Sequence, residues 1–396
     1  MLSRSLLAAA ISMVLVAHAS ADNSEAAISQ SGDSNVAQVL QDVQGGINPV
    51  NSADIEQAGN QNYVSTSQYN YGGRNAIAAR QEGQSNNSDL YQFGGAQTVS
   101  VHQQGSGNTL GSAQTGSGNA AELSQSGESN RIYAGQYSDG AGHTLQVSQS
   151  GVANSVFASQ YDVASSASIQ QDGERNGINL QQSTRVNDFS GQQSGSDNFA
   201  LINQAGGASA VISQAGMSNT IDLQQTAWPY GASASITQSG TANDATVVQR
   251  DGGRHPGGEV LLSQDGQSNA ADVRATGAWS MLDFAQSGSS NQLSVKQSGR
   301  DTSIVGSSIG DANQVEVIQD GDNHSLDLVQ NGSDNMIIAA QGGWWGQGDV
   351  GVISQTGSSN YASLSQNVGG VEGMMTDTAT IIQNGTGNSA VVTQGH

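Results

Sequence analysis

The 396-residue sequence contains no cysteine, which excludes a disulfide framework and a thiolate zinc site. Basic residues are scarce: 11 Lys and Arg stand against 33 Asp and Glu. Because nucleic-acid binding requires many phosphate-neutralising cations, the net charge of −22 argues strongly against it. With 3 prolines, 52 glycines and only 11% charged residues, the composition is unlike that of an ordinary globular enzyme. The 35% of apolar residues can still form a core if they are regularly placed.

Catalytic signatures are also missing. The sequence has no HExxH, GxSxG, Walker or Rossmann motif, and the histidines beyond residue 21 are scattered. We therefore expect no enzyme activity, no catalytic residues, no cofactor and no metal site. The acidic stretch 320–327 (DGDNHSLD) lacks the spacing of a calcium-binding hand and is predicted to be a solvated turn.

The first residues are typical of a secretion signal. Arg4 provides a basic start, residues 6–16 an apolar run, and residues 19–21 (ASA) a small-residue cleavage site. The apolar run is too short to span a bilayer, and no later segment is long and apolar enough to do so. We predict a signal peptide at residues 1–21 and a single repeat domain at residues 22–396.

A short motif recurs throughout that domain. Sixteen units begin at residues 30, 57, 81, 103, 125, 149, 171, 193, 214, 238, 264, 286, 308, 330, 355 and 383. With the first residue of each unit as position zero, position +2 is always Gly and position +5 is always Asn. Position zero is Gln except at Ser308, and position +11 is Gln except at Ala275. Internal repetition on this scale predicts a repeat architecture.

The residues around the motif alternate between apolar and polar, which is the signature of β-strands with one buried face. Asn176, Ile178, Leu180 and Gln182 share one parity, as do the matching positions of the other units. Each unit is therefore predicted to be strand, tight turn, strand, with Gly +2 in a conformation that disfavours side chains. Stacked units would form an all-β solenoid with two facing, parallel, in-register sheets, about 75 Å long at the usual strand spacing.

The Gln and Asn residues fall on the inward parity, where an unpaired amide costs about 1–3 kcal/mol. In register, each amide can donate to its copy in one neighbouring unit and accept from its copy in the other. The alternative is that they are solvated turn residues. Turns would accept Ser, Asp or Asn interchangeably, so the near-invariance favours amide ladders.

Unit-to-unit spacing varies only after position +11, so the solenoid should have one uniform and one variable edge. All four tryptophans lie in the variable connections, and Trp228, Trp344 and Trp345 are candidate adhesion residues. The competing interpretation is that these rings cover the end of the sheet core where a longer loop leaves it open.

The Gln-x-Gly-x-x-Asn-x5-Gln unit within a repeat of about 22 residues resembles the curlin repeat, which builds curli, the functional amyloid fibres of bacterial surfaces. The resemblance covers essentially all of residues 22–396, with about three times as many repeats as familiar curlins have. It implies ladder roles for the inward amides of all units, represented by Gln30, Asn35, Gln41, Gln57, Asn62, Gln68, Gln125, Asn130, Gln136, Gln149, Asn154, Gln160, Gln330, Asn335, Gln341, Gln383, Asn388 and Gln394. The corresponding turn residues are Gly32, Gly59, Gly127, Gly151, Gly332 and Gly385.

The first unit starts near the expected cleavage site and the last closes at Gln394, so no polar cap is expected at either end. Open ends predict head-to-tail growth into a fibre. The resemblance to curlins implies that this fibre is secreted, belongs to the cell surface and biofilm matrix, and contains the chain as major subunit or nucleator. A second curlin subunit and the curli export machinery are further candidate partners. The alternative is a stand-alone solenoid adhesin that binds polysaccharide through its aromatic loops. Outward acids are expected to stack in register and slow assembly, so salt or mild acid should accelerate it.

Overall fold

The computed structural model describes residues 24–43, 50–226, 230–250, 255–343, 348–367 and 376–395, and their regular structure is entirely β. The predicted signal peptide lies outside these described residues. The chain divides into two compact units, residues 1–176 and residues 177–396.

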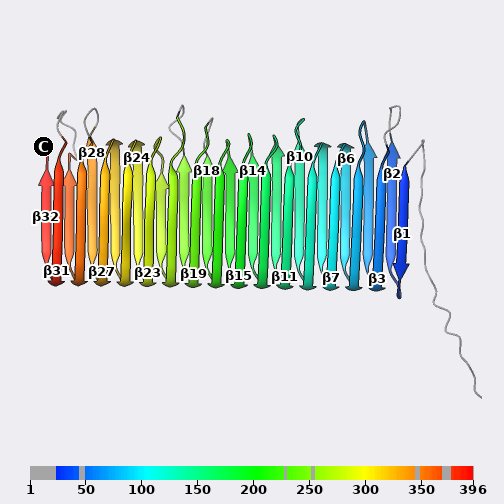
Figure 1. Cartoon of the computed structure of the whole chain (residues 1–396), viewed down its shortest axis with the longest axis horizontal. Helices are drawn as coiled ribbons and strands as arrows, with labels where there is room; N and C mark the ends of the chain where they lie inside the picture. The colour runs from blue at the N-terminus through cyan, green and yellow to red at the C-terminus, as the bar shows by residue number, and fades with distance from the viewer. Residues whose placement is uncertain are drawn as a thin grey trace, which may run out of the picture. The chain divides into compact units, whose positions relative to one another are not determined.

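Unit 1 has two parallel sheets built from alternate strands (Figure 1). One sheet has the order β1-β3-β5-β7-β9-β11-β13 and the other β2-β4-β6-β8-β10-β12. The strands are β1 (Glu25–Ser31), β2 (Val36–Val43), β3 (Ser52–Asn60), β4 (Tyr63–Asn70), β5 (Ala76–Gln84), β6 (Asn87–Gly95), β7 (Thr98–Ser106), β8 (Thr109–Ser117), β9 (Ala120–Glu128), β10 (Arg131–Ser138), β11 (Thr144–Val152), β12 (Ser155–Asp162) and β13 (Ser166–Glu174).

Unit 2 repeats the arrangement, with odd-numbered strands β15 to β31 in one sheet and even-numbered strands β14 to β32 in the other. The strands are β14 (Gly177–Ser183), β15 (Asp188–Ser196), β16 (Phe199–Ala205), β17 (Ser209–Met217), β18 (Thr220–Thr226), β19 (Ser233–Thr241), β20 (Asp244–Arg250), β21 (Glu259–Gln267), β22 (Ala270–Ala275), β23 (Met281–Ser289), β24 (Gln292–Arg300), β25 (Ser303–Asp311), β26 (Gln314–Asp322), β27 (Ser325–Ser333), β28 (Met336–Gly343), β29 (Val350–Ser358), β30 (Tyr361–Gln366), β31 (Thr378–Thr386) and β32 (Ser389–Gln394).

The repeat positions set the strand register. β9 pairs with β11 so that Gln125 faces Gln149 and Gly127 faces Gly151, and β10 pairs with β12 so that Gln136 faces Gln160. Two strands of one repeat never pair with each other, because the turn between them carries the chain from one sheet to the other. The all-β, parallel, in-register β-solenoid fold predicted from the sequence is therefore confirmed.

The core is a thin apolar layer that follows from the alternation along each strand. In β10 the burial alternates from exposed Arg131 to fully buried Ile132, then exposed Tyr133 and buried Ala134. Burial of the inward Ile, Val, Leu and Ala residues, at about 25 cal/mol per Å² of apolar surface, provides the main stabilising free energy. The inward amides lie at the margins of this layer.

The expectation that outward acids stack in register is wrong within each unit. The in-register partners of strand Asp and Glu residues in neighbouring strands are uncharged or basic. Ser298 Oγ, for example, donates to Asp320 at 3.0 Å, and Glu56 faces Arg80. The offset reduces repulsion between adjacent acids, which explains how a chain of net charge −22 keeps this register.

Candidate functional site

A ladder of buried glutamines follows the odd-numbered strands at position zero. In unit 1, Gln57 Nε2 donates to Gln81 Oε1 at 2.8 Å, and Gln81 Nε2 donates to Gln103 Oε1 at 2.7 Å. Beyond the first rung, the amides also donate to a carbonyl of the opposite sheet, as Gln57 Nε2 does to Val36 O at 3.1 Å and Gln81 Nε2 to Tyr63 O at 3.0 Å. Further steps join Gln30 to Gln57, Gln103 to Gln125, Gln125 to Gln149 and Gln149 to Gln171, and in unit 2 Gln193 to Gln214, Gln330 to Gln355 and Gln355 to Gln383. These amides therefore bond neighbouring rungs and also tie the two sheets together.

A second glutamine ladder runs along the even-numbered strands at position +11. Gln68 Nε2 donates to Gln92 Oε1 at 2.9 Å and to Ser52 O at 3.0 Å. The same contact joins Gln41 to Gln68, Gln114 to Gln136, Gln136 to Gln160, Gln341 to Gln366 and Gln366 to Gln394. In both glutamine ladders the amide N–H donates towards the rung that follows in sequence.

The asparagines at position +5 form a third ladder at the uniform edge. Asn62 donates to Asn35 Oδ1 from its backbone N–H at 3.0 Å and from Nδ2 at 3.1 Å, and Nδ2 also donates to Gly83 O at 3.1 Å. Asn–Asn donation therefore runs towards the preceding rung, opposite to the glutamine direction. Equivalent bonds hold Asn130, Asn154, Asn335 and Asn388.

The glycine at position +2 is required for two reasons. Gly127 has a φ of 106°, and a Cβ there would lie 2.1 Å from the carbonyl oxygen of Gly151 in the next rung. The same close approach occurs at Gly32, Gly59, Gly151 and Gly332, whereas Gly385 in the last rung of unit 2 meets only Asn388 Nδ2 at 3.6 Å. Glycine therefore sets the spacing between rungs and also permits the turn.

Two breaks in the ladders have different consequences. Ser308 Oγ donates to Gln330 Oε1 at 2.9 Å, so the side-chain oxygen of the next rung still has a hydrogen-bond donor. Ala275 has no side-chain donor, and the Oε1 of in-register Gln297 is buried without a hydrogen-bond partner. A buried acceptor in this state destabilises by about 1–3 kcal/mol.

Sequence reasoning missed a fourth buried row at the variable edge, six residues before position zero. Asn75 Oδ1 accepts from Gln97 N at 3.2 Å, and Asn119 Oδ1 accepts from His143 N at 3.0 Å. The row is mixed: Asn51, Asn75, Gln97, Asn119, His143 and Ser165 in unit 1, and Asn187, Ala208, Ala232, Ser280, Thr302, His324 and Asp349 in unit 2 are buried. A signal for it was present, because residues 114–119 (QTGSGN) repeat the Gln-x-Gly-x-x-Asn motif at the second turn.

Two buried histidines belong to this fourth row. Burial lowers the pKa of His143, opposed in part by its bond to the Tyr137 carbonyl. Burial also lowers the pKa of His324, whose Nδ1 accepts from Asp349 N at 3.1 Å and lies 3.6 Å from Asp349 Oδ2. The prediction of a solvated turn at residues 320–327 is therefore wrong. Residues 320–322 end β26, residues 325–327 begin β27, and His324 between the strands is only 4% exposed.

The three candidate adhesion residues, Trp228, Trp344 and Trp345, lie outside the described residues. Trp279 lies within the described residues and is 43% exposed. The centroid of its ring lies 4.6 Å from that of His255 and 5.9 Å from the Arg300 guanidinium carbon. Within the described ranges, no cluster of three or more His, Asp or Glu residues could hold a metal ion. That same part of the chain has no helix long and apolar enough to cross a bilayer.

Parallel, in-register sheets joined by buried amide ladders define this protein as a cross-β solenoid. The family model described as the curlin associated repeat matches residues 116–151, which include β9, β10 and the whole unit that starts at Gln125. A curlin repeat is therefore present at residues 116–151, and the repeated rungs of the other units are consistent with the long curlin-repeat variant that the sequence resemblance predicted. A search of curated proteins found no match.

Proposed function

We propose that this protein is a secreted, non-enzymatic structural subunit that assembles head to tail into curli-like amyloid fibres of the bacterial cell surface and biofilm matrix. The observation that carries the proposal is the pair of open edges. Within the described residues, β1 and β2 pair on one side only, and so do β31 and β32. Val39, Ala390 and Val392 are half-buried there, whereas the equivalent apolar residues of inner rungs are almost fully buried. Unpaired strand edges of this kind are templates for another chain.

The two end rungs complement each other in the register used within the units. If β31 of one copy pairs with β1 of the next, Ala379 faces Ala26, Ile381 faces Ile28 and Gln383 faces Gln30. In the other sheet, β32 on β2 would place Ala390, Val392 and Gln394 on Ala37, Val39 and Gln41. Like residues meet at each inward position, so the contact would extend the apolar core and both glutamine ladders.

The direction of the glutamine ladders favours the same contact. Gln30 donates towards Gln57, which leaves the Gln30 side-chain oxygen facing the open edge as an acceptor. At the other end Gln383 Nε2 donates to Tyr361 O at 2.9 Å and keeps a second N–H. Gln30 at one end therefore offers a hydrogen-bond acceptor, and Gln383 at the other end offers a donor. Different, complementary ends are what a heterologous contact needs in order to repeat without closing.

Charge does not oppose this pairing. In the proposed register Glu25 is the one charged residue among the pairs that end at Gln383 in β31 and at Gln394 in β32, and it faces uncharged Thr378. All the other residues in these pairs are uncharged. The repulsion that remains is the long-range field of the net charge of −22, which salt screens over about 10 Å at 0.1 M. Added salt should therefore accelerate fibre growth.

The fibre role is compatible with either a major subunit or a nucleator, with a second curlin subunit and the curli export machinery as further partners. Export through the predicted signal peptide at residues 1–21 is part of the proposal, and so is the absence of catalysis. The curlin repeats at residues 116–151 support the structural role.

The test blocks one edge without disturbing the rung behind it. Glu25 N donates to Asn51 O at 2.9 Å, and since alternate residues of a parallel strand bond to opposite neighbours, the Ala26 N–H faces the open edge. Ala26→Pro removes that donor, whereas the matched control Ala26→Thr retains it. We expect the proline variant to stay monomeric by light scattering and thioflavin fluorescence while retaining its β-sheet circular dichroism. Fibre growth by Ala26→Pro at the rate of the control would overturn the proposed contact.

A further inference from the structure

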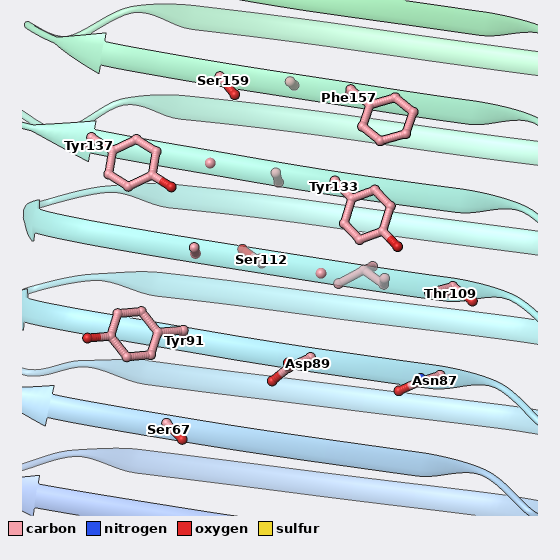
Figure 2. Close-up of a pocket in the computed structure, with 16 residues that line it drawn as sticks. Ser67, Asn87, Asp89, Tyr91, Thr109, Ser112, Tyr133, Tyr137, Phe157 and Ser159 are labelled. Atoms are coloured by element: carbon pink, nitrogen blue, oxygen red, sulfur yellow. The ribbon is translucent and has the colours of Figure 1, made fainter.

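A shallow groove of about 620 Å³ crosses the outer face of the even-numbered sheet in unit 1, from β4 to β12 (Figure 2). Its floor is β8, where Gly111 and Ala113 face outward. Tyr91 on β6 flanks one side, and Tyr133 and Tyr137 on β10 flank the other. Large residues on both sides of small ones create the depression.

The flanking rings are exposed and ordered across the rungs. Tyr133 stacks on Phe157 with a centroid separation of 5.2 Å and an angle of 23°, and Tyr137 stacks on Tyr161 at 5.2 Å and 9°. Each of these rings and that of Tyr91 is between 37% and 44% exposed. A cluster of half-exposed aromatic side chains on one sheet face is typical of a binding surface.

The small floor residues allow this arrangement. A Cβ at Gly111 would lie 2.9 Å from Cδ1 of the Tyr133 ring, and one at Gly135 would lie 2.9 Å from Cε2 of Tyr137. The missing Cβ atoms of these glycines therefore allow the two rings to lie this close to the strands. Burial raises the pKa of Tyr91, reinforced by Tyr69 and Tyr71, so this phenol stays a neutral donor and acceptor over the physiological range.

The polar lining restricts the ligand class. Asp89 is the one charged residue that lines the groove. Around it the outward lining side chains with hydrogen-bonding groups are Ser67, Asn87, Thr109 and Ser159. A carboxylate within a chain of net charge −22 repels polyanions and a second copy of this chain. The groove instead combines aromatic rings with hydroxyl groups, one amide and the Asp89 carboxylate as a hydrogen-bond acceptor. This combination suits an uncharged polyhydroxyl ligand, because its C–H faces stack on rings and its hydroxyls need hydrogen-bond partners.

We propose that this groove binds a neutral polysaccharide lying across the strands of unit 1. The lining spans β4, β6, β8, β10 and β12, four strand spacings, or roughly 19 Å at the usual separation. An extended glycan therefore contacts several rungs at once, with its sugar faces on Tyr91 and Tyr133 and its hydroxyls on Asp89 and its neighbours. The site is on the sheet face of unit 1 and does not include β1 or β2, the strands of this unit that are proposed to pair with another copy.

The experiment is isothermal titration calorimetry of the full-length processed chain with cellohexaose as the neutral probe and an alginate oligosaccharide as the anionic one. Tyr91→Ala and Tyr133→Ala should each raise the Kd for cellohexaose at least about fivefold, because each removes a stacking face. The matched control is Phe199→Ala, which removes an exposed ring from β16 of unit 2, and its Kd should change less than twofold.

Ala113→Leu separates binding from folding, because it fills the groove between Tyr91 and Gly135 and removes no ring. It should abolish cellohexaose binding while the thermal midpoint stays unchanged. Equal affinity for the two probes, no detectable cellohexaose binding by the wild-type chain, or unchanged affinity in Ala113→Leu would each overturn the proposal.

Discussion

The gap in the even-numbered glutamine ladder gives the sharpest quantitative prediction. Ala275 lies in register between Gln249 and Gln297, and Gln297 Oε1 is buried without a partner. Ala275→Gln would donate to that oxygen and accept from Gln249. Satisfying the acceptor recovers about 1–3 kcal/mol, and ordering the new side chain costs up to about 2 kcal/mol. We expect a net stabilisation of about 1 kcal/mol.

The control for this prediction is Ala275→Met, which has a similar length but no amide. It fills the same space and leaves Gln297 Oε1 unsatisfied, so it should not stabilise the chain. Urea unfolding followed by circular dichroism gives the global change, and hydrogen exchange of the amides in β22 and β24 gives the local one. If the glutamine variant is no more stable than the methionine variant, side-chain hydrogen bonds between rungs do not stabilise this fold.

Three further outcomes follow from the same geometry. Gly127→Ala should lower the free energy of unfolding by about 3 kcal/mol or more, because a Cβ there combines a positive φ with a backbone collision. Gly387→Ala is the control, since Gly387 has open space around it, and urea unfolding should show a far smaller loss of stability. Because burial lowers the pKa of His143, the unfolded chain binds the proton more readily, so stability should fall as pH drops below about 6.5. His143→Asn, which reproduces the Asn119 arrangement, should reduce the fall of the thermal midpoint between pH 7 and pH 5 (roughly the window of His titration), with His324 accounting for part of what remains. An unchanged slope would contradict the assignment. Raising salt from about 0.02 to 0.2 M should shorten the thioflavin lag time as screening increases, and a longer lag would refute a charge-limited assembly rate.

The fold was predictable because one pattern recurs without interruption. Alternation along Asn176, Ile178, Leu180 and Gln182 identifies a buried face, and recurrence of the same residues fixes the register. Burial of an amide at each turn then implies partners in neighbouring rungs, since an isolated amide is unstable in a core. The structure adds the opposite directions of the glutamine and asparagine ladders, which residue identity does not specify.

The fourth buried row and the aromatic groove were not predicted, because neither places the same residue type at the same position of every repeat. The fourth buried row holds different residue types with different contacts. Asn75 and His143 accept from the backbone N–H of the next rung, whereas the side chain of Gln97 donates to the Phe93 and Gly116 carbonyls and its Oε1 has no partner. The aromatic groove depends on outward residues in different repeats, such as Tyr133 and Phe157, that become neighbours only in the folded register. Outward positions vary freely in sequence, so their clustering is visible only in three dimensions.

The absence of cysteine allows a direct test of the proposed fibre contact. In the head-to-tail register Ala27 faces Thr380, both side chains are exposed, and adjacent strands are about 4.8 Å apart, within the range that a disulfide can bridge. Ala27→Cys with Thr380→Cys should give a covalent ladder of multimers when fibres are oxidised and denatured. The offset pair, Ala27→Cys with Ile382→Cys, should give monomers, because two residues of displacement place the cysteines beyond reach. Equal cross-linking of the two pairs, or monomers from both, would contradict head-to-tail assembly in register.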